Sequence, residues 1–321
     1  MTGVTLDGGE TVEADLVIDA TGRGTRLPVW LEKWGYHRPD EVTVDVGISY
    51  ATLRVRIPDG LQEKIVVAGA SREQPLGLGM LFYEDGIWTL TTFGVARVDA
   101  PKDFDEMCAL ADEILPGHIA AAIRSGQPVG EVAIHKYPTS RWRRYDKLDR
   151  FPDGILPVGD SVVSFNPTYG QGMTMTSLQA RELQRLLGTG EDLSMGFRKA
   201  VARNTFPVWH MNAIGDHILH GASGKRPAWY RPVGNLFDQF LGSAETEPVL
   251  IATSIDYLDD AVGLHGLFQG SPPLVELEAP ATQEHLGLLA PNDLRNLHSH
   301  RVPYLRKVSF IHQNAMSPLI F

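Results

Sequence analysis

The chain has 321 residues, 43% of them hydrophobic, and a formal net charge of −10. This length and apolar content exclude a wholly disordered chain and predict about two domains. The negative charge disfavours nucleic acid as a partner, because phosphate binding needs a positive field.

The number of cysteines and the hydropathy of the chain limit the class of protein further. Cys108 is the single cysteine, which excludes an internal disulfide. There is no run of about 18 apolar residues, and the N-terminus lacks the charged-then-apolar pattern of a secretory signal. We therefore expect a soluble cytoplasmic protein without a transmembrane segment.

Residues 4–12 alternate polar and apolar side chains around the turn sequence Asp7-Gly8-Gly9, which predicts a β-hairpin. A short apolar run over residues 14–20 follows and ends at Thr21-Gly22. That profile predicts a buried parallel strand entering a turn, and α/β folds bind ligands at such strand ends.

Further β-forming segments occupy residues 42–57, 64–70, 79–95 and 129–137. We expect them to form one curved antiparallel sheet. Two helices are predicted before the last of these strands. Asp103 is a good N-cap for the first, which ends near Ile114, and Pro116 predicts the start of a second that runs to Ile123.

Residues 141–150 mix Arg, Trp, Tyr and Lys, as nucleic-acid-binding segments do, but Asp146 and Asp149 interrupt them. In a chain with net negative charge, we interpret this segment as a solvated lead-in to the next strand.

The most informative stretch is residues 156–173, LPVGDSVVSFNPTYGQGM. An apolar run ends at Gly159-Asp160, a polar loop follows, and Gly170-Gln171-Gly172 opens a predicted helix. One carboxylate and one cluster of backbone N–H groups should therefore face a common crevice. This arrangement suits a sugar hydroxyl and a developing anion.

A second long helix is predicted over residues 194–221, interrupted near Pro207. His210, His217 and His220 could share one face of it, but no carboxylate completes a known zinc pattern, so we expect no metal site. Residues up to about 290 are predicted to be helical and loop-rich. The residues from His298 onward fit no domain pattern.

In residues 156–173 the chain resembles FAD-dependent monooxygenases of the para-hydroxybenzoate hydroxylase-like family, which includes aromatic hydroxylases and epoxidases. Residues 15–22 resemble a strand and turn of the same family. The resemblance covers roughly residues 4–220. It implies a mixed α/β fold with an incomplete Rossmann-like FAD/NAD(P)-binding domain, an inserted antiparallel β-sheet substrate domain and a helical C-terminal region.

The implied domains are a partial FAD-binding domain over residues 1–40, a β-sheet substrate domain over 41–140, a returning FAD-binding segment over 141–225, and a C-terminal helical and loop region over 226–321.

The resemblance implies these cofactor-binding residues: Thr21, Gly22, Gly159, Asp160, Pro167, Gly170, Gln171, Gly172 and Met173. Asp160 would accept a hydrogen bond from a ribityl hydroxyl, and Pro167 would lie beside the isoalloxazine ring. The backbone N–H groups of residues 170–173 would point at the ring edge that becomes negative on reduction. The resemblance assigns no catalytic side chain.

Flavoproteins of this kind begin with a strand, turn and helix that carry Gly-x-Gly-x-x-Gly. This chain lacks that motif, since Gly22-Arg23-Gly24 and Gly77-Leu78-Gly79 have no third glycine and neither precedes a predicted helix. We therefore expect an N-terminally truncated member of the family.

The implied function is hydroxylation or epoxidation of a small apolar organic substrate with O₂, with FAD as cofactor and NAD(P)H as a candidate electron donor. A related flavin reductase or halogenase is one alternative. A truncated, non-catalytic remnant with weak or no flavin binding is another.

Overall fold

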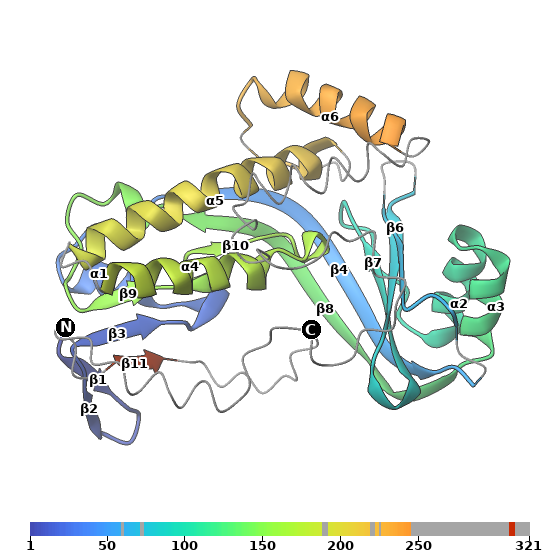
Figure 1. The fold of residues 1–321 in the computed structure, drawn as a ribbon, viewed down its shortest axis with the longest axis horizontal. Coiled ribbons are helices and arrows are strands. Elements are labelled where there is room, and N and C mark those ends of the chain that lie inside the picture. Colours follow the sequence, from blue (N-terminus) through green and yellow to red (C-terminus); the bar gives the residue numbers. More distant parts are fainter. Residues whose placement is uncertain are drawn as a thin grey trace.

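The computed structural model describes residues 1–58, 61–70, 74–187, 192–218, 222–224 and 226–244, together with the backbone of Val308–Ile311. Two long strands, β4 (Glu41–Arg56) and β8 (Gln127–Arg143), connect the two ends of the molecule (Figure 1). Helices α4 (Gly172–Leu187) and α5 (Leu193–Ile218) cover a small parallel sheet at one end. Helices α2 (Phe104–Ile114) and α3 (Gly117–Arg124) lie at the other. The mixed α/β class predicted from the sequence is confirmed.

The larger sheet has six strands in the order β10-β8-β4-β7-β6-β5, and every neighbouring pair is antiparallel. The remaining strands are β5 (Ile65–Ala68), β6 (Leu76–Phe82), β7 (Ile87–Gly94) and β10 (Val163–Ser164). This confirms the predicted antiparallel sheet. Strand β8 is longer than predicted and includes Trp142 and Arg143.

Helices α2 (Phe104–Ile114) and α3 (Gly117–Arg124) pack against one face of this sheet. The core between them is apolar and includes Trp88, Leu90 and Met107, all fully buried. Cys108 lies in the same core, and burial raises the pKa of its thiol. Both helices begin where the sequence predicts.

Asp103 caps α2, because its Oδ1 accepts a hydrogen bond from the Glu106 N–H at 2.8 Å. We expect Asp103→Ala to lower the free energy of unfolding by about 1 kcal/mol. Urea denaturation measures this, with Asp105→Ala as the control, since Asp105 lies in the same first turn but does not cap the helix. Equal losses in the two variants would contradict the capping role.

The smaller sheet is parallel and has the order β11-β3-β9. Strands β3 (Leu16–Asp19) and β9 (Ile155–Pro157) are buried along their whole length, as their apolar sequences predict. Strand β11 (Val308–Ile311) comes from the C-terminal residues that fitted no pattern. The predicted N-terminal hairpin is present as β1 (Gly3–Thr5) and β2 (Thr11–Glu13).

Helices α4 (Gly172–Leu187) and α5 (Leu193–Ile218) pack on each other beside this sheet. The predicted interruption at Pro207 is wrong, because α5 runs through the proline. Val208 and Trp209 are buried directly after it, so tertiary packing holds the helix together. His220, which was predicted to lie on this helix, is outside the described residues. A further helix, α6 (Tyr230–Ala244), packs on α5.

A second correction concerns Gly22-Arg23-Gly24. These residues form a short 3₁₀ helix, η1 (Gly22–Gly24), and α1 (Leu27–Lys33) follows, although no helix was predicted there. Pro28 in the first turn favours the start of α1, and the Leu27 N–H donates to Thr25 Oγ1 at 3.0 Å.

Candidate functional site

Asp19 anchors the carboxyl end of β3. Its buried carboxylate accepts hydrogen bonds from the Thr21 N–H at 3.1 Å, the Thr21 hydroxyl and the Thr25 hydroxyl. Ser161 Oγ also lies 3.3 Å from it. The predicted cofactor residue Thr21 thus uses its side chain to shape the turn, and Ser161 connects this turn to the end of β9.

The second turn is η4 (Gly159–Ser161), which directly follows β9. Gly159 has φ +59°, and a Cβ there would lie 3.2 Å from Thr176 Oγ1 of α4. Its N–H donates to Gln179 Oε1 at 2.7 Å. Glycine is therefore needed at this position so that the turn can approach α4.

Asp160 belongs to a polar cluster that also contains Arg23, Tyr137 and Ser164, with the Ser164 hydroxyl at its centre. Ser164 Oγ donates to Asp160 Oδ2 at 3.1 Å, accepts from Arg23 Nη1 at 3.2 Å and lies 2.9 Å from the Tyr137 hydroxyl. The Arg23 guanidinium also stacks 4.5 Å above the Tyr137 ring. Four separate elements, η1, β8, η4 and β10, thus supply this cluster.

Burial raises the pKa of Asp160, while the Ser164 hydrogen bond and the charges of Arg23 and Arg143 oppose that rise. Burial likewise raises the pKa of Tyr137, so its phenol is neutral at physiological pH. A carboxylate whose charge is incompletely compensated is a strong acceptor for a further hydroxyl donor.

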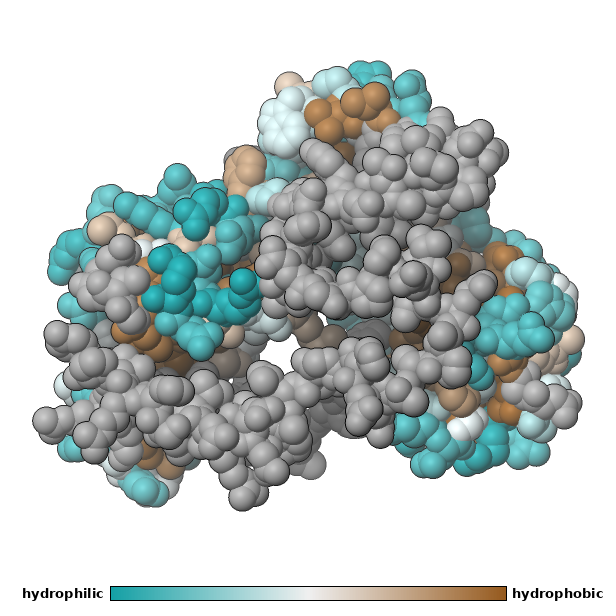
Figure 2. Space-filling model, viewed as in Figure 1, coloured by the Kyte–Doolittle hydropathy of each residue, from teal (hydrophilic) through white to brown (hydrophobic). Residues whose placement is uncertain are grey.

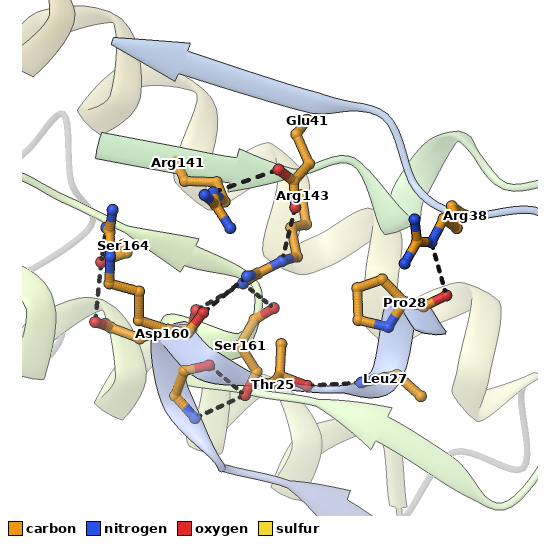
Figure 3. Close-up of polar contacts among 12 residues, drawn as sticks. Thr25, Leu27, Pro28, Arg38, Glu41, Arg141, Arg143, Asp160, Ser161 and Ser164 are labelled. Carbon is orange, nitrogen blue, oxygen red and sulfur yellow. Dashed lines mark hydrogen bonds and ion pairs between the residues drawn. The ribbon is translucent and has the colours of Figure 1, made fainter. Parts of the chain in front are cut away.

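Arg143 connects the two turns (Figure 3). Its side chain is only 3% exposed and forms an ion pair with Glu41 at 3.1 Å. The guanidinium also donates to the backbone carbonyls of Asp160 and Ser161, both at 3.2 Å, and of Arg23 at 2.8 Å. The predicted solvated lead-in is therefore wrong for Arg143 and for the buried Trp142 and Tyr145.

The loop before α4 forms the other side of the site. It includes η5 (Pro167–Tyr169) and Gly170, whose φ is +67°. The first backbone bond of α4 runs from the Met175 N–H to the Gln171 carbonyl at 3.0 Å, so the N–H groups of residues 172–174 precede the helical ladder. A Cβ at Gly170 or Gly172 would meet no atom within 4 Å.

The side chain of Gln171 also leaves a polar atom unsatisfied at the start of α4. Its Oε1 is buried and has no hydrogen-bond partner among the described residues. A buried acceptor without a donor costs free energy that a ligand could recover. Free N–H groups, open space and this amide thus converge where α4 begins.

A buried network fixes this loop to α5. Asn166 Nδ2 donates to Asp216 Oδ1 at 2.7 Å, and the Tyr169 hydroxyl donates to the same oxygen at 3.1 Å. Asn166 Oδ1 accepts from the Thr168 N–H at 3.0 Å. The backbone around Pro167 and Gly170 is therefore positioned before any ligand arrives.

The structure places the nine predicted cofactor residues on two connected turns, on the loop before α4 and in the first turn of α4. Thr21 and Gly22 join η4 through Ser161, to which the Gly22 N–H donates at 3.0 Å. Gly159 joins α4 through Thr176 and Gln179. Met173 is placed by its backbone, because its side chain is mostly exposed.

The side chains of this site that sequence reasoning missed include Arg23, Tyr137, Arg143 and Ser164. The cluster of arginines in residues 141–150 was the visible signal for Arg143, but the sequence does not show that Glu41 and three carbonyls surround it. A separate cavity of about 360 Å³, lined in part by Asp15, Asp192 and Ser194, lies at the amino ends of β3 and β9. It faces away from the strand ends that bind ligands in α/β folds.

The chain is 62% identical over 248 residues to "Protein Rv3254" of Mycobacterium tuberculosis. The aligned region covers 75% of this chain and 52% of the relative. The chain thus spans about half the length of the curated relative it matches. Residues 224–253 match the family model described as "Mycobacterium Rv3254 C-terminal domain".

Among solved structures, the Diels-Alderase PyrE3 of pyrroindomycin biosynthesis aligns with a TM-score of 0.54 and 19% identity, over 81% of this chain and 52% of that one. The flavin-dependent brominase Bmp2 aligns with a TM-score of 0.49 and 12% identity, over 79% of this chain and 58% of that one. The first alignment shows a shared fold.

Proposed function

We propose that this chain binds FAD between the ends of β3 and β9 and the start of α4, and that it belongs to an FAD-dependent monooxygenase. The reaction would hydroxylate or epoxidise a small apolar organic substrate with O₂, with NAD(P)H as electron donor. The observation that carries the proposal is the half-buried Asp160, which lies directly after β9 in a turn that packs against α4 through Gly159. The N–H groups of residues 172–174 precede the helical ladder of the same helix.

The residues present fit a flavin. Asp160 can accept a hydrogen bond from a ribityl hydroxyl, and Gly159 allows the turn to approach α4 closely. The N–H groups of Gly172 and Met173 lie at the positive end of the α4 dipole and suit the electron-rich edge of the ring. When bound, the flavin would supply the redox chemistry and the activation of oxygen.

The chain's own residues would bind and orient both molecules and exclude water. Pro167 would lie along the ring, held by the hydrogen bonds of Asn166 and Tyr169 to Asp216. Thr21 and Gly22 would contact the pyrophosphate side of the cofactor, where Arg23 supplies positive charge.

The face of the antiparallel sheet opposite α2 and α3 would offer a wall for an apolar substrate. Tyr50 and Phe93 occupy paired positions on β4 and β7, and their ring centroids are 6.4 Å apart. The Tyr50 hydroxyl is buried without a hydrogen-bond partner among the described residues, and burial raises its pKa. A neutral phenol at this place can orient a polar group of the substrate.

The experiment that tests the reaction starts from the purified chain loaded with FAD. We expect NAD(P)H oxidation that consumes O₂ and that rises when an apolar aromatic or polyene substrate is added. NAD(P)H oxidation without oxygen transfer would identify a reductase, and a halide requirement would identify a halogenase. Absence of retained flavin would favour the non-catalytic remnant, and each of these three results would contradict a monooxygenase.

A further inference from the structure

The surface formed by α5, α6 and the turn before α6 carries large apolar side chains that remain well exposed. Phe206 is 53% exposed, Trp229 44%, Val233 43% and Leu236 69%. Figure 2 shows apolar side chains gathered over α6, at the top of the view. We call these four residues the aromatic patch.

Ring contacts show that the aromatic patch is continuous. His210 lies between Phe206, at a ring-centroid distance of 4.3 Å, and Trp229, at 5.3 Å. Val233 and Leu236 follow Trp229 at spacings of four and three residues, so they lie on the same face of α6. Tyr230 and Gly234 lie on the side of α6 that packs against α5. The Tyr230 hydroxyl lies 2.5 Å from His210 Nδ1, and a Cβ at Gly234 would clash with Ile218.

Positive charge borders the aromatic patch. Lys199 and Arg203 precede Phe206 on α5 by seven and three residues and share its face, and Arg226 precedes Trp229 by three residues. All three are exposed, and none forms an ion pair with a described residue. Residues 193–215 and 222–236 contain no Asp or Glu, in a chain whose net charge is −10.

We propose that the aromatic patch and its basic border bind the surface of an anionic lipid bilayer. Trp and Phe enter the interface between headgroups and acyl chains, and Lys and Arg attract anionic headgroups. No helix among the described residues is long and apolar enough to span a bilayer, so this contact would be peripheral.

Charge favours a bilayer over two other occupants. A second copy of the chain would bring the basic borders of two patches together, and like charges repel. A nucleic acid would meet the repulsion of the net negative charge, and Val233 and Leu236 offer it no polar contact. The proposal does not depend on flavin binding.

The test is flotation of the full chain with vesicles of phosphatidylcholine alone and of phosphatidylcholine mixed with phosphatidylglycerol. We expect binding to the mixed vesicles, release at high salt and little binding to the neutral ones. Lys199→Glu combined with Arg203→Glu should weaken binding about 30-fold. The control pair, Lys33→Glu with Arg181→Glu, makes the same change in net charge on other exposed surfaces and should have little effect.

A second patch variant and its matched control test the contribution of apolar side chains to vesicle binding. Val233→Ser with Leu236→Ser should weaken binding about tenfold. Ile65→Ser with Val67→Ser alters equally apolar side chains on β5, each 68% exposed, and should leave binding unchanged.

Three results would overturn the proposal. The first is no binding to the mixed vesicles at low salt, and the second is an equal loss of binding in the patch variants and the control variants. The third is a chain that binds no vesicles but forms a dimer, if Val233→Ser with Leu236→Ser abolishes that dimer. The salt dependence of the unmutated chain tests the charge contribution even if a variant does not fold.

Discussion

Replacing Asp160 by Asn should weaken FAD binding about 10- to 100-fold, which is the effect of losing one hydrogen bond to a charged acceptor. The substitution preserves the size of the side chain and can still accept from Ser164, so the turn after β9 should remain intact. Fluorescence titration of FAD measures the change in affinity.

The same substitution should raise the Tm of the flavin-free protein at neutral pH. Because burial raises the pKa of Asp160 in the folded state, folding favours the protonated carboxyl. The folded chain therefore has its full stability at low pH, where the Asp160 carboxyl is neutral. It loses part of that stability as the pH rises through the folded-state pKa of Asp160. The Tm advantage of Asp160→Asn should therefore shrink as the pH falls through that pKa and vanish below the ordinary carboxyl pKa of the unfolded chain.

Asp153→Asn is the matched control, because Asp153 is an exposed carboxylate shortly before the start of β9. It should change neither FAD affinity nor the pH dependence of Tm. An Asp160→Asn variant that binds FAD as tightly as the unmutated chain would show that Asp160 is not a cofactor contact.

Replacing Arg143 by Met should lower the free energy of unfolding by about 3–5 kcal/mol, which is the usual cost of breaking a buried ionic group. The variant leaves the carbonyls of Arg23, Asp160 and Ser161 without their donor and Glu41 without its buried partner. Urea denaturation monitored by fluorescence measures the loss.

Arg141→Met is the control for Arg143. Both side chains leave β8 and approach Glu41, but Arg141 is a third exposed and lies 3.3 Å from the carboxylate without a hydrogen bond to it. A partly exposed pair of this kind contributes less than about 1 kcal/mol. Comparable losses for the two variants would contradict the role of Arg143 in connecting the turns.

Local signals in the sequence predicted much of this site. The apolar runs that end at Thr21-Gly22 and at Gly159-Asp160 predicted two strand ends, and Gly170-Gln171-Gly172 predicted the start of α4. These signals are local because a strand, a turn and a helix N-terminus each depend on neighbouring residues.

Contacts between distant segments could not be predicted in the same way. Arg143 is buried because Glu41, more than a hundred residues earlier, and two turns converge on it. The continuous helix through Pro207 and the pairing of β11 with β3 likewise depend on tertiary packing. Residues 245–307, predicted in part to be helical, lie outside the described residues.

The most direct test of the account is the flavin content of the purified chain after incubation with FAD and gel filtration. Visible absorbance against protein concentration should give about one FAD per chain, and Asp160→Asn should lose most of it on the column. A chain that folds normally yet retains no flavin would contradict the proposal that the turns after β3 and β9 and the start of α4 form a flavin site.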